Sequence, residues 1–139
     1  MEIFDIIPAS QEEAEVINNK LFEFDKSQGL LQERIPILKN YVIKDNGAII
    51  AGINIAIYHW GILYIDVLFV DEQYRGQRLG SVLLAKVESE AKAMGATLVR
   101  LDTFDFQAKD FYLKHGYEIL GVLEDCPKGH TLYYLKKNL

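Results

Sequence analysis

The chain has 139 residues, half of them hydrophobic and a quarter charged, which is the balance of an ordinary globular protein. Fifteen basic and twenty acidic side chains give a net charge of −5, which argues against a basic surface for nucleic acid or an anionic membrane. The single cysteine, Cys126, rules out an internal disulfide and a cysteine-rich metal cluster. We expect one cytoplasmic domain over residues 1–139, with no metal, no nucleic-acid partner and no membrane segment.

The first third of the chain predicts a strand, a helix and an ambiguous segment. EIFDII is predicted to be a short strand that ends at Pro8, and Ser10 with Glu13 has the spacing of a helix capping box. We interpret LLQERIP, after the helix, as a short helical turn. The helix is predicted to bury one apolar face, made of Ala14, Ile17, Leu21 and Phe24.

The middle of the chain predicts three antiparallel strands in sequence order. YVIKD and AIIAGINIAIY flank Asn46-Gly47, the residue pair that a two-residue hairpin turn prefers. A second tight connection at HWG leads into GILYIDVLFV. We interpret Trp60, in that connection, as a packing residue or a dimer contact rather than a catalytic group.

The second half of the chain alternates helices and strands. TLVRLDT, YEILGVL and TLYYLKK are predicted strands, and QAKDFYLKHG is a short helix with Ala108, Phe111 and Tyr112 pointing inward. A longer helix ends at Gly95 and has an apolar face made of Leu79, Leu83, Val87, Ala91 and Met94.

This order of elements is β-α-(α)-β-β-β-α-β-α-β-β. It predicts an α+β fold with a mixed, mostly antiparallel central sheet flanked by helices. The strand-helix-strand unit from Gly61 to Thr103 is the predicted parallel centre of the sheet.

The segment YRGQRLGS places two glycines and two arginines between a predicted strand and a predicted helix. The start of a helix has unpaired backbone N–H groups and a partial positive charge, which suits a phosphate or diphosphate. Arg75 and Arg78 would add positive charge. The alternative is a plain turn with solvated arginines. The segment is not a Walker loop, because no Lys-Ser/Thr follows the second glycine, and its spacing is not GxGxxG.

This segment resembles the coenzyme A diphosphate loop of the GNAT superfamily of N-acetyltransferases, written RGxGxG or QxxGxG. Arg75, Gly76 and Gly80 match, and Arg78 stands where the family usually has its middle glycine. The family's next helix typically carries Asn-x-x-Ala-x-x-Phe/Leu-Tyr-x-Lys-x-Gly-Phe/Tyr. The segment DFQAKDFYLKHGY has Asp105 in place of Asn and otherwise matches at Ala108, Phe111, Tyr112, Lys114, Gly116 and Tyr117.

The resemblance covers essentially the whole chain. It implies that acetyl-CoA is the acetyl donor, that an amine attacks the thioester directly and that no metal takes part. It implies that the coenzyme diphosphate binds to Arg75, Gly76, Gln77, Arg78, Leu79, Gly80 and Ser81. It also implies that the pantetheine arm lies along Leu68, Phe69 and Val70, with further coenzyme contacts from Asp105, Ala108 and Tyr112.

Catalytic candidates follow from the same resemblance. Tyr112 would face the coenzyme sulfur as a general acid, although helical spacing fits a core aromatic equally well. A phenol is a weaker acid than a thiol, so a hydrogen bond to the developing thiolate is the safer description. The Leu68 backbone N–H is the candidate oxyanion donor.

The general base has two candidates. Asp66 interrupts the apolar run LYIDVLFV, so it is either a base or a buried carboxylate bound to a structural partner. His130 titrates near neutrality and is either a base or an exposed residue without a role. Acidic side chains at the ends of neighbouring elements either attract a cationic amine or form a solvated rim: Asp102, Asp105, Glu124 and Asp125.

We therefore expect an acetyl-CoA-dependent N-acetyltransferase that acts on a primary amine of a small molecule or a lysine-like acceptor. A homodimer is expected by analogy only. One alternative is a catalytically silent module that binds or senses acyl-CoA on the same fold. The other is an unrelated nucleotide-binding domain.

Overall fold

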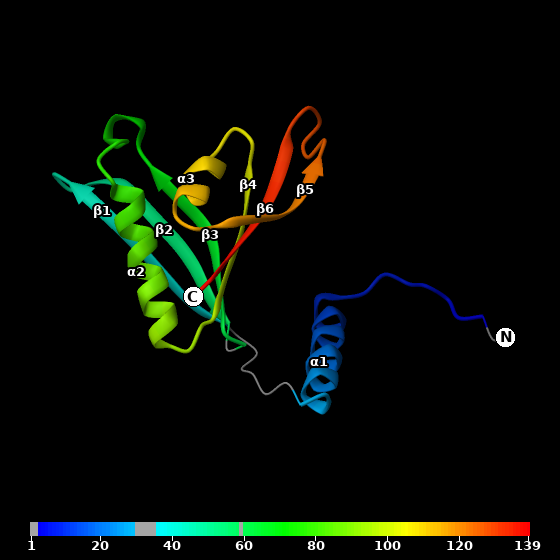
Figure 1. Cartoon of the computed structure of the whole chain (residues 1–139). Helices are drawn as coiled ribbons and strands as arrows, with labels where there is room; N and C mark the ends of the chain where they lie inside the picture. Colours follow the sequence, from blue (N-terminus) through cyan, green and yellow to red (C-terminus); the bar gives the residue numbers. More distant parts are fainter. Residues whose placement is uncertain (1–2, 30–35, 59) are drawn as a thin grey trace. The chain divides into compact units, whose positions relative to one another are not determined.

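A computed structural model describes residues 3–29, 36–58 and 60–139 of the chain (Figure 1). The chain divides into two compact units, Met1–Arg34 and Ile35–Leu139. The predicted helical turn in LLQERIP lies outside the described residues, apart from Pro36. No helix in the described ranges is long and apolar enough to cross a membrane. The single domain over residues 1–139 stays a prediction.

The N-terminal unit contains helix α1 (Gln11–Ser27). Its predicted capping box is confirmed: the Glu13 N–H donates to Ser10 Oγ (3.1 Å), and the Ser10 N–H donates to Glu13 Oε1 (3.0 Å). Within this unit α1 buries none of its side chains, and Ile17, Leu21 and Phe24 on its predicted apolar face are exposed. In the described part of this unit no second helix or strand is present, so no second layer covers this apolar stripe there.

The predicted first strand, EIFDII, is also wrong. Residues 3–10 form no strand, and Ile3, Phe4, Ile6 and Ile7 are exposed. A strand exists through hydrogen bonds to a neighbouring strand, and β-prone residues alone do not supply one. The described part of the chain therefore contains six strands where the sequence predicts seven.

The C-terminal unit is built on a six-stranded sheet in the order β1-β2-β3-β4-β6-β5 (Figure 1). Neighbouring strands are antiparallel except for β3 and β4, which are parallel. This confirms the predicted mixed, mostly antiparallel sheet and its parallel centre. The strands are β1 (Ile37–Asp45), β2 (Ala48–Tyr58), β3 (Ile62–Val70), β4 (Leu98–Phe104), β5 (Glu118–Glu124) and β6 (Thr131–Asn138).

The hairpin between β1 and β2 turns at Asn46-Gly47, as predicted. Asn46 has φ 49° and Gly47 has φ 82°, so both residues have the left-handed backbone that this type of two-residue turn requires. Pairing then runs from Asp45 opposite Ala48 to Ile37 opposite Ile57. The hairpin is therefore specified by its turn residues.

Three helical elements follow β3: the short 3-10 helix η1 (Glu72–Tyr74), α2 (Leu79–Ala93) and α3 (Lys109–Lys114). Helices α2 and α3 lie on the same face of the sheet (Figure 1). The predicted apolar face of α2 is confirmed except at its end, because α2 stops at Ala93 and Met94 is 46% exposed. The side chains of α2 that join the core are Leu83, Leu84, Val87 and Ala91.

The pairing between β3 and β4 is short. It joins only Ile62–Tyr64 to Leu98–Arg100, although β3 runs on to Val70 and β4 to Phe104. The two strands therefore diverge just beyond Tyr64, and the sheet opens in its middle. Because α2 connects β3 to β4, the N-terminus of α2 lies at the open end of this gap.

A β-bulge lies at the start of the divergence. Asn54 pairs with Val67 and Ile55 pairs with Ile65, so Asp66 is an extra residue on β3. An extra residue reverses which side chains face which side of a sheet. Leu68 is thereby placed opposite the buried Ile53, whereas Val67 and Phe69 are exposed.

Candidate active site

The gap between β3 and β4 leaves one side of β3 without a strand partner. From Val67 to Val70, β3 remains paired with β2, but no pairing with β4 is found in the described residues beyond Tyr64. Backbone N–H and C=O groups on that side can bind an extended ligand that carries amides, in the way that a peptide adds to a sheet edge. Leu68, Phe69 and Val70, the predicted pantetheine contacts, all lie in this segment.

The glycine-arginine segment forms the N-terminus of α2. Gly76 has φ 84° and Arg78 has φ 62°, so both have left-handed backbones. Arg78 provides no side-chain cap, and the first intrahelical bond is donated by Val82 N–H to Arg78 O (3.0 Å). The N–H groups of the first helical residues therefore point out of the helix, free of its ladder. This is the geometry that binds an anion.

The left-handed backbone explains why Arg78 is unusual at its position. A non-glycine residue in this region costs about 1 kcal/mol or more, because its Cβ approaches the following carbonyl oxygen. Glycine, which the family pattern has here, avoids that cost. Arg78 thus occupies a position whose backbone favours glycine.

Two other residues of the segment are held by neighbouring elements. Arg75 Nε donates to Val70 O (3.2 Å), which ties the guanidinium to the end of β3. A Cβ on Gly80 would lie 3.3 Å from the Phe111 ring, so glycine at this position allows α2 to pack closely against α3. The loop is therefore fixed to both sides of the gap.

Ser81 makes a contact that the sequence does not reveal. Its Oγ lies 2.8 Å from His115 Nε2, and His115 Nδ1 lies 2.8 Å from Phe111 O. Both side chains are partly buried. In the sequence, His115 lies within the second motif, one residue before Gly116. The motif allows any residue there, so only the position of His115 inside the motif could have indicated a role.

Tyr112 is buried on α3, with 4% of its surface exposed, and packs edge-on against Phe111 and Tyr117. Burial raises the pKa of Tyr112 well above that of an ordinary phenol. No hydrogen bond to its hydroxyl is found in the described residues, whereas the Tyr117 hydroxyl donates to Glu88 (2.6 Å). Tyr112 is therefore protonated at neutral pH and has a donor to offer to a ligand.

The carboxylate of Asp105 is held within the fold. Its Oδ1 lies 3.0 Å from His130 Nδ1, and its Oδ2 accepts from the Thr131 N–H (3.0 Å). Burial opposes ionisation of Asp105, but these hydrogen bonds outweigh it and lower the pKa of the carboxyl. A coenzyme contact through this carboxylate stays a prediction. The His130 side chain is 47% exposed, and the hydrogen bond leaves its Nε2 available.

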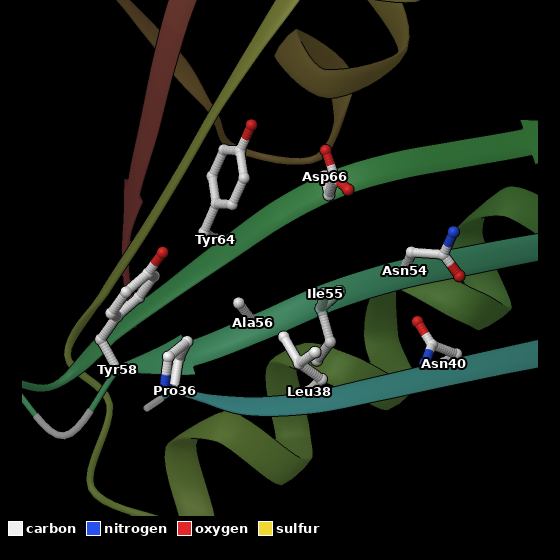
Figure 2. A pocket seen from close by; sticks show the side chains of 9 residues that line it. All are labelled: Pro36, Leu38, Asn40, Asn54, Ile55, Ala56, Tyr58, Tyr64 and Asp66. Carbon is white, nitrogen blue, oxygen red and sulfur yellow. The ribbon is translucent and has the colours of Figure 1, made fainter. Parts of the chain in front are cut away.

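A hollow with a few polar groups in a largely apolar lining lies on the opposite face of the sheet from α2 (Figure 2). Its volume is about 300 Å³. Asp66 and Tyr64 project into it from β3, and the amides of Asn40 and Asn54 lie on the neighbouring strands. The other lining residues are Pro36, Leu38, Ile55, Ala56 and Tyr58. The hollow adjoins the point where β3 leaves β4.

Asp66 is exposed in this hollow, which corrects one interpretation of the sequence. A buried carboxylate bound to a structural partner is wrong: no ion pair or hydrogen bond of Asp66 is found in the described residues. The cause is the bulge. Asp66 is the extra residue, whereas Ile65 before it and Leu68 after it pack in or against the core. Asp66 therefore faces solvent from within an apolar run.

The electrostatics of Tyr64 indicate where negative charge gathers. Burial raises the pKa of Tyr64 first, and the carboxylates of Asp102 and Asp66 raise it further. The Arg100 guanidinium lies 4.6 Å from the centre of the Tyr64 ring and lowers the pKa. Of the four acidic residues predicted to form a rim, Asp102 thus joins Asp66 near Tyr64. Asp105 binds His130.

The other two acidic residues lie at the turn between β5 and β6. Asp125 Oδ1 accepts from the Gly129 N–H (3.3 Å), and Glu124 ends β5. No group of histidine, cysteine and acidic side chains that could hold a metal ion is found in the described ranges.

The sequence and the fold were compared with known proteins. Residues 6–117 match the profile of the Acetyltransferase (GNAT) family. The chain belongs to this family. Enzymes of the GNAT family are acyltransferases that use acetyl-CoA.

Relatives agree with this assignment. A blasticidin-S acetyltransferase from Streptomyces morookaense is 33% identical over 106 residues, which are 76% of this chain and 77% of the relative. The crystal structure of an acetyltransferase from Bacillus cereus superposes with a TM-score of 0.87 at 38% identity, and covers 98% of both chains.

A more distant GNAT structure contains the coenzyme. A Bacillus anthracis protein assigned as a streptothricin acetyltransferase was solved in complex with acetyl coenzyme A. It has a TM-score of 0.66 at 23% identity, and the match covers 76% of this chain and 65% of that one. This likeness concerns the fold alone. The predicted family, fold class and enzyme class are confirmed.

Proposed function

We propose that this GNAT enzyme transfers the acetyl group of acetyl-CoA to the primary amine of a small molecule or a lysine-like acceptor. The observation that carries the proposal is the opening of the sheet between β3 and β4. A helix N-terminus with free backbone N–H groups lies at its open end, and a hollow that contains the Asp66 carboxylate adjoins its closed end. A thioester in the gap would meet an amine in the hollow.

The residues at the gap fit the coenzyme. The diphosphate would lie on the N–H groups of Leu79, Gly80 and Ser81, with the side chains of Arg75 and Arg78 beside it. Gly76 and Gln77 complete that loop. The left-handed Gly76 has no atom within 4 Å of an added Cβ, so its surroundings leave room for a ligand. The pantetheine amides would pair with the free side of Leu68, Phe69 and Val70, and Asp105 and Ala108 would flank the arm.

The hollow fits a compact, cationic acceptor. Asp66 and Asp102 attract an ammonium group, and the amides of Asn40 and Asn54 can hold its polar substituents. A small-molecule amine is also supported by the Streptomyces relative, which acts on an antibiotic according to its name. An amine would therefore bind as a cation and lose its proton before it attacks.

Three groups of the chain would serve the acyl transfer. The Asp66 carboxylate accepts the proton that the ammonium loses, directly or through water. The free amine then forms a bond to the thioester carbonyl carbon, and the Leu68 N–H donates to the carbonyl oxygen as negative charge builds there. The bond to sulfur breaks with its electron pair on sulfur, and the Tyr112 hydroxyl donates a hydrogen bond to that thiolate. The nitrogen then loses its second proton, which passes to the sulfur directly or through water, so the products are the amide and the free thiol.

The test of this proposal is an assay for free thiol released from acetyl-CoA. The purified chain is mixed with acetyl-CoA and with polyamines, aminoglycosides, nucleoside antibiotics or lysine peptides in separate reactions. We expect thiol release that saturates with at least one amine and an acetylated product found by mass spectrometry. Binding of acetyl-CoA without turnover of any amine would contradict the proposal and favour a sensing module.

A further inference from the structure

His115 and Ser81 form a pair that the catalytic scheme above does not use. His115 lies at the end of α3 and Ser81 in the first turn of α2, so the pair joins the two helices that flank the gap. The Phe111 and His115 rings lie 4.3 Å apart between centroids, which holds the imidazole in place. The contact is thus a fixed part of the predicted diphosphate site.

The proton positions of the pair follow from its partners. The Phe111 carbonyl can only accept, so His115 Nδ1 carries a proton in both charge states of the imidazole. In the neutral ring, Nε2 has a lone pair, and the Ser81 hydroxyl must donate to it. The Ser81 hydroxyl proton is then committed to His115, and Ser81 offers a ligand only lone pairs.

Protonation of His115 reverses this hydrogen bond. The imidazolium donates from Nε2 to Ser81 Oγ, and the Ser81 hydroxyl proton becomes free to donate elsewhere. A phosphate needs donors and is repelled by lone pairs, so it favours the protonated pair. The positive charge of the imidazolium adds to the attraction.

We propose that Ser81 and His115 form a proton-coupled phosphate switch, in which coenzyme binding draws one proton from solvent onto His115 and turns the Ser81 hydroxyl toward the diphosphate. The proposal rests on the coenzyme site proposed above. His115 acts through Ser81 and is therefore a positioning residue. No covalent bond changes, and the proton returns to solvent when the coenzyme leaves.

Other charged side chains lie on the elements around the pair. They are Lys86, Glu88, Glu90 and Lys92 on α2, with Arg78 as its N-cap residue, Lys109, Asp110 and Lys114 on α3, and Lys136 and Lys137 on β6. Glu88 accepts from Lys137 Nζ (2.9 Å) and from the Tyr117 hydroxyl. Lys137 Nζ would lie 4.0 Å from a Cβ on Gly116, the residue that follows His115. Asp110 lies 3.9 Å from Lys109 Nζ.

Arg78 and Lys114 add further positive charge to the two helices. The negative charge of the bound diphosphate would favour the protonated form of His115. The switch therefore requires His115 to hold a proton more tightly in the complex than in the free enzyme.

The test is isothermal titration calorimetry of acetyl-CoA binding at pH 7 in two buffers with different ionisation enthalpies. The difference in apparent binding enthalpy gives the number of protons taken up. Titration of the ligand itself is the same for every variant, so differences between variants isolate the protein. We expect net proton uptake by the wild type, its loss in His115→Gln, and a reduction by about half or more in Ser81→Ala.

His130→Gln is the matched control, because it removes a histidine that is bonded to Asp105 rather than to Ser81. It should keep the proton uptake of the wild type. Full proton uptake in either His115→Gln or Ser81→Ala would overturn the switch. If His115→Gln does not fold, the result for Ser81→Ala alone tests the proposal. Failure of the wild type to bind acetyl-CoA at all would contradict the proposed function instead.

Discussion

The two halves of the central sheet differ in what they carry. Strands β1, β2 and β3 form a continuously paired half that holds the hollow with Asp66. Strands β4, β6 and β5 form a second paired half, against which α3 places Tyr112. Among the described residues, strand pairing between the two halves is limited to the pairs from Ile62–Leu98 to Tyr64–Arg100.

This difference indicates that the two halves would take part in different steps of the acetyl transfer. The first half would hold the acceptor and take its proton, and the second would meet the leaving sulfur. A coenzyme between them would replace the hydrogen bonds that the strands do not make with each other. Perturbing one half should therefore alter one part of the reaction, which the following variants test.

Tyr112→Phe, in the second half, should have the largest effect. Loss of a positioned proton donor lowers kcat by about 100-fold or more, while the KM for acetyl-CoA changes little. Steady-state kinetics of thiol release measures both constants. The control is Tyr117→Phe, which removes the hydroxyl bonded to Glu88 and should cost about 1 kcal/mol of stability without a comparable loss of kcat. Equal kcat losses in both variants would show that Tyr112 is only a packing residue.

Asp66→Asn, in the first half, should mainly affect the acceptor. Loss of the charged partner weakens binding of an ammonium by about tenfold, so the KM for the amine rises and kcat falls at neutral pH. The dissociation constant for acetyl-CoA should stay the same in calorimetry. A rise in that constant with an unchanged KM for the amine would place Asp66 on the coenzyme side of the gap.

Arg78→Gly tests the segment that joins the halves, with a smaller effect. Loss of the side-chain charge should weaken acetyl-CoA binding by about threefold to tenfold. Relief of the left-handed backbone should raise stability by about 0.5 kcal/mol after the greater freedom of glycine in the unfolded chain is allowed for. Asn46→Gly, at another non-glycine position with a left-handed backbone in the same unit, is the control. It should leave acetyl-CoA binding alone; tighter binding by Arg78→Gly would show that the arginine side chain does not hold phosphate.

Tyr41→Phe should have the smallest effect, and it concerns the contact between β1 and α2. The Tyr41 hydroxyl donates to Glu90 and, with lesser help from Lys86 and Lys39, lowers the pKa of that carboxyl. A lowered folded-state pKa adds stability above the unfolded value near pH 4.5, and this stability is lost as the pH falls below it. In urea titrations, the stability difference between wild type and variant should therefore shrink from pH 7 to pH 3. A difference that is the same at both pH values would rule out this linkage.

Local features of the fold were predictable where the responsible residues lie close together in sequence. The Ser10–Glu13 capping box, the Asn46-Gly47 turn and the apolar face of α2 all depend on spacings of one to four residues. The loop from Arg75 to Ser81 was located for the same reason. These predictions needed no knowledge of distant partners.

Features that depend on distant partners were missed. EIFDII has the composition of a strand but no strand partner in the described residues. Asp66 was expected to be either a base or a buried carboxylate, and only the bulge against β2 turns it outward. The contact between Ser81 and His115 joins residues thirty-four positions apart on two helices. The periodicity of hydrophobic residues in the sequence contains no information about such contacts.

The sequence by itself therefore determined the family, the order of the strands and helices from β1 onward, and the place of the glycine-arginine loop. These depend on local backbone preference and on motif residues that lie near one another in the chain. The tertiary structure alone decided how far β3 and β4 pair, which way Asp66 faces, and which side chain engages Ser81. Those outcomes depend on register and packing between elements, where one inserted residue changes the face of every side chain that follows.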